Sequence, residues 1–139
     1  MRLNPHLSFD GQCEAAFGFC EKCLGGKIHL MLTYEDSPLA QQTPRAWGKN
    51  ILHATLAFGE QVLTGADVME GYQKPRGFSI ILEIGEAAEA DRIFTTLAEG
   101  GAVLMPLQET FWALRFGEVT DQFGTPWTIN CGKGTPAEK

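Results

Sequence analysis

Three histidines are the side chains of this chain best suited to acid–base or metal chemistry. His6, His29 and His53 lie in segments where apolar and polar residues alternate as they do in strands. The alternation predicts that all three point to one face of a sheet. Because imidazole titrates near neutral pH and binds transition metals, two of them together could hold a metal ion or form an acid–base pair. Alternatively, each histidine lines a polar cavity and hydrogen-bonds only to neighbouring strand residues.

The C-terminal half supplies a second group of candidate site residues. Alternation predicts that Trp112, Phe116 and Glu118 share one face of a strand. Because two pleats separate Trp112 from Phe116, we expect their rings to lie roughly 13 Å apart along the strand and to line the wall of a cavity. The Glu118 carboxylate joins His6 and His53 as a candidate catalytic group.

An internal repeat predicts the elements that position these residues. Residues 9–28 reappear at 84–103, shifted by about 75 positions, and residues 58–62 reappear at 123–127, shifted by about 65. The first match covers a strand, a helix and a strand, and the second covers a hairpin turn. Two copies of one βαβββ module therefore make up the chain. We expect an α+β fold in which one curved eight-stranded mixed sheet carries both helices outside and forms a cleft inside.

Glycine and proline residues, which interrupt helices and strands, indicate the module boundaries. We expect a first module at residues 1–66, a linker at 67–77, a second module at 78–131 and a frayed tail at 132–139. The expected strands are residues 2–9, 27–34, 51–58, 61–66, 78–84, 102–109, 112–120 and 126–130. The long loop between the second and third strands is predicted to act as a lid, with Trp47 folding over the cleft.

Apolar residues at helical spacing predict one helix in each module. The helices are expected at residues 12–24 and 87–99, and each is followed by a Gly-Gly pair, as helix C-termini often are. Aligning the two copies makes Phe19 and Phe94 the shared residues that anchor the helices to the sheet. The inward stripe expected for the first helix is Ala16, Phe19, Cys20, Cys23 and Leu24.

The repeat also pairs positions on the cleft face of the two modules. It aligns Asn4 with Ser79 on the first strands, and Leu63 with Thr128 on the last strands. Together with the histidines and the aromatic residues, these positions define the expected ligand-binding surface. The predicted ligand-binding residues are Asn4, His6, His29, His53, Leu63, Ser79, Trp112, Phe116 and Thr128.

Composition and charge exclude several classes of partner. The net charge of −6 argues against binding to a nucleic-acid backbone, which requires clustered Lys and Arg. No apolar run approaches the ~20 residues that span a bilayer, and the N-terminus lacks the apolar core of a signal peptide. We therefore expect no nucleic-acid partner, no membrane partner and a cytoplasmic location. The four cysteines are expected to be buried free thiols, because three of them lie on one apolar helix stripe.

Two groups of motifs resemble those of a known superfamily. The arrangement of two βαβββ modules resembles the vicinal oxygen chelate superfamily, which includes glyoxalase I, bleomycin- and fosfomycin-resistance proteins and extradiol dioxygenases. Within it, the chain is most similar to the PhnB-like branch. The residues that carry the resemblance are Leu7-Ser8-Phe9-Asp10-Gly11 with Glu14-Ala15, Leu24-Gly25-Gly26, Glu109-Thr110-Phe111-Trp112-Ala113, Phe116-Gly117 and Val119-Thr120-Asp121-Gln122-Phe123-Gly124-Thr125-Pro126-Trp127.

The resemblance implies where a metal would bind. Metal enzymes of the superfamily take their ligands from the first and last strands of each module, and those places correspond to Asn4, Leu63, Ser79 and Thr128 here. None of the four is His, Glu or Asp, so we expect neither a transition metal at this position nor any other cofactor. Some members of the branch carry a demethylubiquinone methyltransferase label, but the chain has no glycine-rich strand-to-helix loop to hold S-adenosylmethionine.

Two functions from different classes follow. The first is a metal-free protein that binds a small molecule in the cleft, and the superfamily implies that it forms a homodimer. The alternative is a lyase, isomerase or dioxygenase-type enzyme, metal-dependent or acid–base, that uses His6, His29 and His53 with Glu83 or Glu118.

Overall fold

The computed structural model describes residues 1–133 and divides the chain into two compact units. Unit 1 is Met1–Gln73, and unit 2 begins at Lys74. Unit 1 contains β1 (His6–Phe9), α1 (Cys13–Leu24), β2 (Lys27–Thr33), the short 3-10 helices η1 (Ala40–Gln42) and η2 (Arg45–Trp47), β3 (Ile51–Phe58) and β4 (Gln61–Asp67). Unit 2 contains β5 (Ile80–Glu83), α2 (Ala87–Ala98), β6 (Ala102–Gln108), β7 (Ala113–Thr120) and β8 (Pro126–Gly132).

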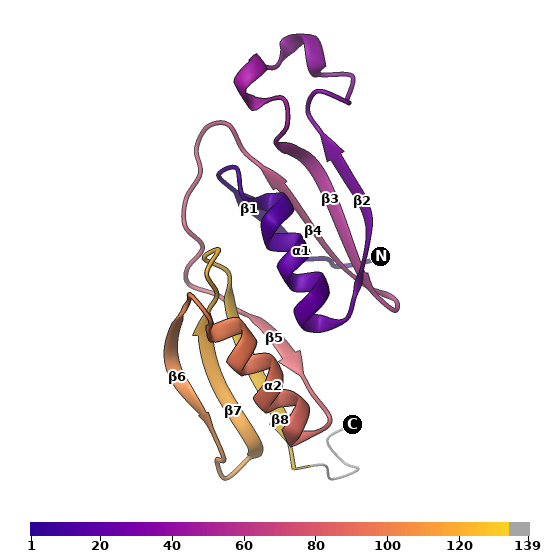
Figure 1. The fold of residues 1–139 in the computed structure, drawn as a ribbon. Helices are drawn as coiled ribbons and strands as arrows, with labels where there is room; N and C mark the ends of the chain where they lie inside the picture. Colours follow the sequence, from indigo (N-terminus) through magenta and orange to yellow (C-terminus); the bar gives the residue numbers. More distant parts are fainter. Residues whose placement is uncertain (134–139) are drawn as a thin grey trace. The chain divides into compact units, whose positions relative to one another are not determined.

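Both units have the predicted βαβββ order, which confirms the α+β class and the tandem modules (Figure 1). The strands pair as two four-stranded sheets, in the orders β1-β4-β3-β2 and β5-β8-β7-β6. The eight expected strands therefore form two sheets, one in each unit, and not a single sheet. In each sheet the first and last strands of the module pair in parallel, and the other pairs are antiparallel. Gly132 ends β8, and residues 134–139 of the expected tail lie outside the described residues.

Each helix covers one face of the sheet in its own unit (Figure 1). The buried residues of α1 are Cys13, Ala16, Phe17, Cys20 and Cys23, and those of α2 are Ala90, Ile93, Phe94 and Leu97. Both stripes follow the spacing of an amphipathic helix.

The anchor of α1 is Phe17, so the prediction of Phe19 was wrong. Phe17 is fully buried and meets Phe9 of β1 edge to face, with ring centroids 6.3 Å apart, whereas Phe19 is half-buried. The buried stripes of the two helices align Ala16 with Ala90, Cys20 with Phe94 and Cys23 with Leu97, so Phe17 has no aromatic counterpart in α2. Aligning Phe19 with Phe94, one position away from the alignment of the buried stripes, caused the error.

Two glycines let the aromatic anchors approach the sheets. A side chain at Gly65 of β4 would place its first carbon 2.7 Å from the Phe17 ring. At Gly117 of β7 that carbon would lie 2.9 Å from the ring of Phe94 and 2.9 Å from the backbone of Leu107. Real Cβ atoms do not approach other atoms so closely, so each anchor ring fills the space that glycine leaves open.

A buried carboxylate organises each unit. Asp67, which is 1% exposed, accepts hydrogen bonds through Oδ1 from the backbone N–H groups of Gly11 and Cys13, and through Oδ2 from that of Ile51. It therefore joins the start of α1 to the start of β3. In unit 2, buried Asp121 accepts hydrogen bonds from two backbone N–H groups of the β7–β8 turn and from the indole N–H of Trp127, at 2.8 Å.

The loop between β2 and β3 is folded back on itself. The backbone N–H of Glu35 donates to Gly48, and that of Tyr34 donates to Asn50. The Trp47 ring packs edge to face on Tyr34, at a centroid distance of 6.4 Å. Tyr34 in turn donates its hydroxyl hydrogen to the backbone oxygen of Asp67. The lid predicted for this loop stays a prediction.

Candidate functional site

Each sheet has one face covered by its helix and a second face, here called the open face. In unit 1 the strand register defines two rows of side chains across that face. One row runs Ser8, Ala66, His53 and Leu32, and the other runs His6, Thr64, Thr55 and Leu30. These rows bring together two of the three histidines, as the strand alternation predicted.

His6 and His53 form the polar centre of the open face of unit 1. Their rings stack with centroids 6.2 Å apart and planes 16° from parallel. His6 Nδ1 lies 2.7 Å from the hydroxyl oxygen of Thr64, and that hydroxyl donates its hydrogen to the backbone oxygen of Pro5. Both bonds form at once only when His6 Nδ1–H is the donor. The tautomer that results leaves His6 Nε2 as a hydrogen-bond acceptor.

The environment of His6 favours its neutral form. Partial burial lowers the pKa of His6, because removing the ring from water penalises the charged imidazolium. The neighbouring His53 lowers the same pKa further, because a second positive charge at this separation would repel the first. The neutral His6 ring can accept a hydrogen bond as well as donate one.

His29 does not join this pair. The register between β2 and β3 shifts between Ile28 and Leu30, and His29 is the extra residue of that bulge. It is exposed and makes no hydrogen bond or ring contact within the described part of the chain. After the shift, Met31 pairs with Ala54 of the helix-covered side. The assumption of unbroken alternation along the strand caused the error for His29.

Leu63 is a core residue, so the prediction that it lies on the cleft face was wrong. It is 4% exposed and pairs with fully buried Leu56 on the face that α1 covers. The next residue, Thr64, takes its place on the open face. Sequence reasoning missed Thr64, although aligning it with Thr128 would have matched identical residues on the last strands of the two modules. Asn4 precedes β1 and is exposed.

The open face of unit 2 has the same layout with different chemistry. One row runs Glu83, Asn130, Phe116 and Gln108, and the other runs Ile81, Thr128, Glu118 and Met105. Ser79 and Thr128 join their hydroxyl groups at 2.6 Å, and Asn130 Nδ2 donates to Glu83 at 2.9 Å. The structure thus places Ser79, Phe116, Glu118 and Thr128 on one face, as predicted, while Asn130 Oδ1 is buried without a hydrogen-bond partner among the described residues.

Aromatic rings cluster at the start of β7. Trp112 contacts Phe116 with ring centroids 5.2 Å apart, and it contacts Phe111 at 4.8 Å, both edge to face. The predicted separation of roughly 13 Å between Trp112 and Phe116 was wrong. Trp112 lies in the bend before β7, where the chain is not extended, so its ring folds back onto Phe116. Phe111 is 89% exposed and Trp112 45%, which leaves an apolar surface on a mostly polar face.

The four superfamily positions do not fit a transition metal. The side chain of Leu63 is buried on the opposite face of its sheet, and the hydroxyl groups of Ser79 and Thr128 bond each other. Asn4 is left as a lone amide. Within residues 1–133 no group of three His, Cys, Asp or Glu side chains is arranged to hold a metal ion. The His6–His53 pair could supply at most two nitrogen ligands, fewer than metal sites of this kind use.

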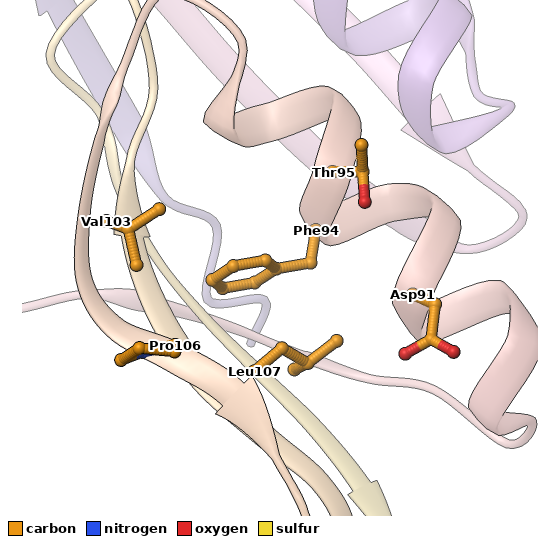
Figure 2. Close-up of a pocket in the computed structure, with 6 residues that line it drawn as sticks. All are labelled: Asp91, Phe94, Thr95, Val103, Pro106 and Leu107. Atoms are coloured by element: carbon orange, nitrogen blue, oxygen red, sulfur yellow. The ribbon is translucent and has the colours of Figure 1, made fainter.

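A separate cavity of about 370 Å³ opens between α2 and β6, on the helix-covered side of unit 2. The ring of Phe94 points into it between Val103, Pro106 and Leu107, and Asp91 and Thr95 lie along the helix side (Figure 2). It contains no residue that sequence reasoning assigned to a site. The Asp91 carboxylate is already engaged by Arg115, whose Nε donates to it at 2.9 Å. That ion pair holds the pKa of Arg115 above its usual range.

Comparisons with known proteins agree with this fold. A family model described as 3-demethylubiquinone-9 3-methyltransferase matches residues 1–130. Protein YjdN of Escherichia coli (strain K12) is 33% identical over 147 residues, which cover 99% of this chain and 100% of that protein. The crystal structure of protein PA1353 from Pseudomonas aeruginosa has a TM-score of 0.88 and 42% identity over 95% of this chain and 98% of that one. A PhnB protein from Bacillus cereus has a TM-score of 0.80 at 22% identity, over 95% and 100% of the two chains, and supports the fold.

Proposed function

The chain belongs to the 3-demethylubiquinone-9 3-methyltransferase family, a PhnB-like branch of the vicinal oxygen chelate superfamily, and we propose that it is a metal-free small-molecule-binding protein. The ligand is taken up by the open sheet faces, through the residues that line them. The observation that carries this proposal is the exposed aromatic cluster of Phe111, Trp112 and Phe116 beside the polar rows of β7 and β8. Apolar stacking surface next to a few directed polar groups is typical of small-molecule sites.

The polar groups on these faces support binding more than catalysis. The hydroxyl groups of Ser79 and Thr128 satisfy each other, and His6 is held neutral in one tautomer by Thr64. Such groups orient a ligand by hydrogen bonds that contribute about 1 kcal/mol each, while a stacked ring adds area burial and about 0.5–1.5 kcal/mol of aromatic contact.

The methyltransferase activity in the family description has no support in these residues. A dinucleotide-like or nucleoside cofactor is commonly held by free backbone N–H groups where a strand runs into a helix. At the β1–α1 junction those donors are occupied, since Gly11 and Cys13 both donate to the buried carboxylate of Asp67. The residues therefore do not fit S-adenosylmethionine at this junction.

The proposal of a metal-free protein rests on the side chains at the four positions where the superfamily binds metal. Zinc, nickel and iron sites need several imidazole, thiolate or carboxylate ligands in one place. The superfamily positions carry an amide, a buried leucine and two hydroxyl groups that are paired with each other. Elemental analysis of dialysed protein tests this part, and we expect substoichiometric zinc, nickel and iron.

A thermal-shift screen, run with and without a chelator, tests the binding function. We expect ligands that raise the melting temperature equally in both conditions. Calorimetry on a hit should then show that Trp112→Ala weakens binding more than His6→Ala, after circular dichroism has shown that both variants are folded. Stabilisation that disappears with chelator, or binding abolished by His6→Ala but unchanged in Trp112→Ala, would overturn the proposal in favour of chemistry at the histidine pair.

A further inference from the structure

We propose that the open face of unit 2 selects ligands that carry a positive charge on an apolar or aromatic body. The inference rests on the proposed binding function and narrows it to one chemical class. It follows from the arrangement of carboxylates and aromatic rings on β5, β7 and β8, and from the different residues at the corresponding positions of unit 1.

Two carboxylates on this face have no positive partner. Glu83 of β5 accepts a hydrogen bond from the neutral amide of Asn130, and Glu118 of β7 forms no hydrogen bond or ion pair with any described residue. The ion pairs of unit 2 lie elsewhere and join Arg92 to Glu89, Arg115 to Asp91 and Lys133 to Glu109. Lys74 and Arg76, which precede β5, form no ion pair among residues 1–133.

Phe116 shares a row with one of the carboxylates and a strand with the other. Phe116 occupies the same row as Glu83, two strands away across Asn130, and it precedes Glu118 by two positions on β7, so both point to the same face. From the strand spacing and the rise per residue, the backbones of Glu83 and Glu118 are roughly 12 Å apart. That separation leaves room for a small organic cation on the face that Phe116 shares with Glu83 and Glu118.

The contact between Trp112 and Phe116 exposes a suitable surface for a cation. The rings meet edge to face with planes 69° apart, so they form a corner and not a closed stack. The faces of aromatic rings carry negative electrostatic potential, and Trp is the strongest of the aromatic side chains in attracting a cation. A quaternary or primary ammonium group in this corner would meet ring faces, and the carboxylate of Glu118 lies two positions beyond Phe116 on the same face of β7.

Unit 1 acts as an internal comparison. The register equates Glu83 with Ser8, Phe116 with His53, and Glu118 with Thr55. At the corresponding places unit 1 therefore has a hydroxyl group, an imidazole and a second hydroxyl group, with no carboxylate in either row. The fold alone does not require acidic residues at these positions, which supports a role in recognition.

The test uses three probes of nearly equal size and different charge, titrated into the full-length protein. The probes are benzyltrimethylammonium, its neutral isostere neopentylbenzene, and the anion phenylmethanesulfonate. Binding is followed by amide chemical shifts and by the indole N–H signals of the tryptophans. We expect the ammonium probe to bind at least tenfold more tightly than the sulfonate and to shift signals of β7 and β8. Added salt should weaken its binding.

Variants identify the groups responsible. Glu118→Gln and Trp112→Leu should each weaken binding of the ammonium probe about two- to fivefold, as expected for partly exposed charge and cation–π contacts. Glu99→Gln is the matched control, because Glu99 is an exposed carboxylate at the end of α2 and belongs to neither row of the open face. It should leave the affinity unchanged.

Two results would overturn the inference. One is equal or tighter binding of the sulfonate or the neutral isostere, and the other is failure of the ammonium probe to bind at millimolar concentration. Either result leaves the proposed function standing if the thermal-shift screen yields other ligands whose binding depends on Trp112. A screen without any such ligand removes the binding function itself.

Discussion

The histidine pair on the open face of unit 1 links its hydrogen bonding to pH. His6 and His53 stack at 6.2 Å, and His6 is held through Nδ1 by Thr64. Since burial and the second histidine both lower the pKa of His6, the folded protein takes up a proton there less readily than the unfolded chain does.

The pH dependence of stability follows from that difference. Above pH 6.5, the ordinary pKa of the ring, His6 is neutral in both states and has no effect. As the pH falls below this value the unfolded state is protonated first, so the free energy of unfolding should decrease. Urea denaturation at pH values from about 7.5 to about 5.5 measures this effect. The free energy of unfolding should decrease less for His6→Asn than for the natural chain. Parallel curves for the two proteins would contradict this prediction.

Gly117 should tolerate no side chain. A Cβ there would lie 2.9 Å from both the Phe94 ring and the Leu107 backbone, so Gly117→Ala should lower the free energy of unfolding by about 1–3 kcal/mol. Gly18→Ala is the matched control, because Gly18 lies within α1 with no atom within 4 Å of the added carbon. That change should raise stability by about 0.5–1 kcal/mol, since alanine favours helix. Denaturant midpoints measured on both variants check the contrast.

The sequence predicted the sheet face of a side chain well where alternation is unbroken and poorly where it is not. His6, His53, Ser79 and Thr128 all lie on the open faces. The extra residue at His29 cannot be seen in a pattern of apolar and polar residues, because a bulge forms in response to its partner strand. Contacts between side chains, such as the corner formed by the rings at the start of β7, depend on three-dimensional packing.

At the scale of elements, α1 depends on Phe17. Phe17→Ala should lower the free energy of unfolding by about 3–5 kcal/mol, because the side chain is fully buried over Gly65 and against Phe9. Phe19→Ala removes the same atoms from a half-buried position, so it should cost less than about half of that. Chemical denaturation compares the two. Equal losses would mean that both rings anchor the helix.

The thiols of α1 should be inert in the native state. Cys13, Cys20 and Cys23 all lie on the buried stripe, and Cys131 is buried in β8, so all four are free thiols without solvent access, as predicted. Burial and the nearby carboxylate of Asp67 raise the pKa of Cys13 to about 12, which keeps it protonated. A colorimetric thiol reagent should therefore react slowly with the folded protein and with four groups after unfolding. Rapid reaction in native buffer would contradict the prediction.

The order and type of the elements were predictable because the chain repeats itself. Each copy supplies independent support for a strand, a helix and three further strands, and the structure contains them all. The anchor of α1 was harder to predict, because the repeat aligned Phe94 with Phe19 whereas the buried stripes align it with Cys20. A pattern of residue types does not show that the Phe17 ring fits above Gly65, because that contact depends on packing between elements far apart in the chain.

At the scale of the whole molecule, each unit has a complete core and a sheet with two edges. No helix within the described residues is long and apolar enough to cross a membrane. β6 is an edge strand that exposes Val103, Leu104 and Met105, and Phe111 is exposed close to β7. Exposed apolar side chains along an unpaired edge are a liability unless another surface covers them.

We expect a second copy of the chain to cover this surface, so that the protein is a homodimer in solution. Light scattering at micromolar concentration should give about twice the 15.2 kDa of one chain. Replacing Leu104 by Glu should shift the equilibrium toward the monomer, because it places a charge on the exposed edge without disturbing a buried residue. A monomer in the unsubstituted protein would contradict the expectation.

The hydrogen bonds of Asp67 have a consequence for the order in which the chain folds during synthesis. Asp67 accepts hydrogen bonds from the backbone N–H groups of Cys13 and Gly11, which precede it by 54 and 56 residues. On the ribosome those donors therefore emerge long before their acceptor, and α1 cannot complete its N-terminal cap until nearly all of unit 1 has left the exit tunnel. Much of unit 2 is then still inside the tunnel or not yet made, and ribosomes add only about 5–20 residues per second. Small mixed domains fold within milliseconds to about a second, so the first module has time to close while the second is still being translated.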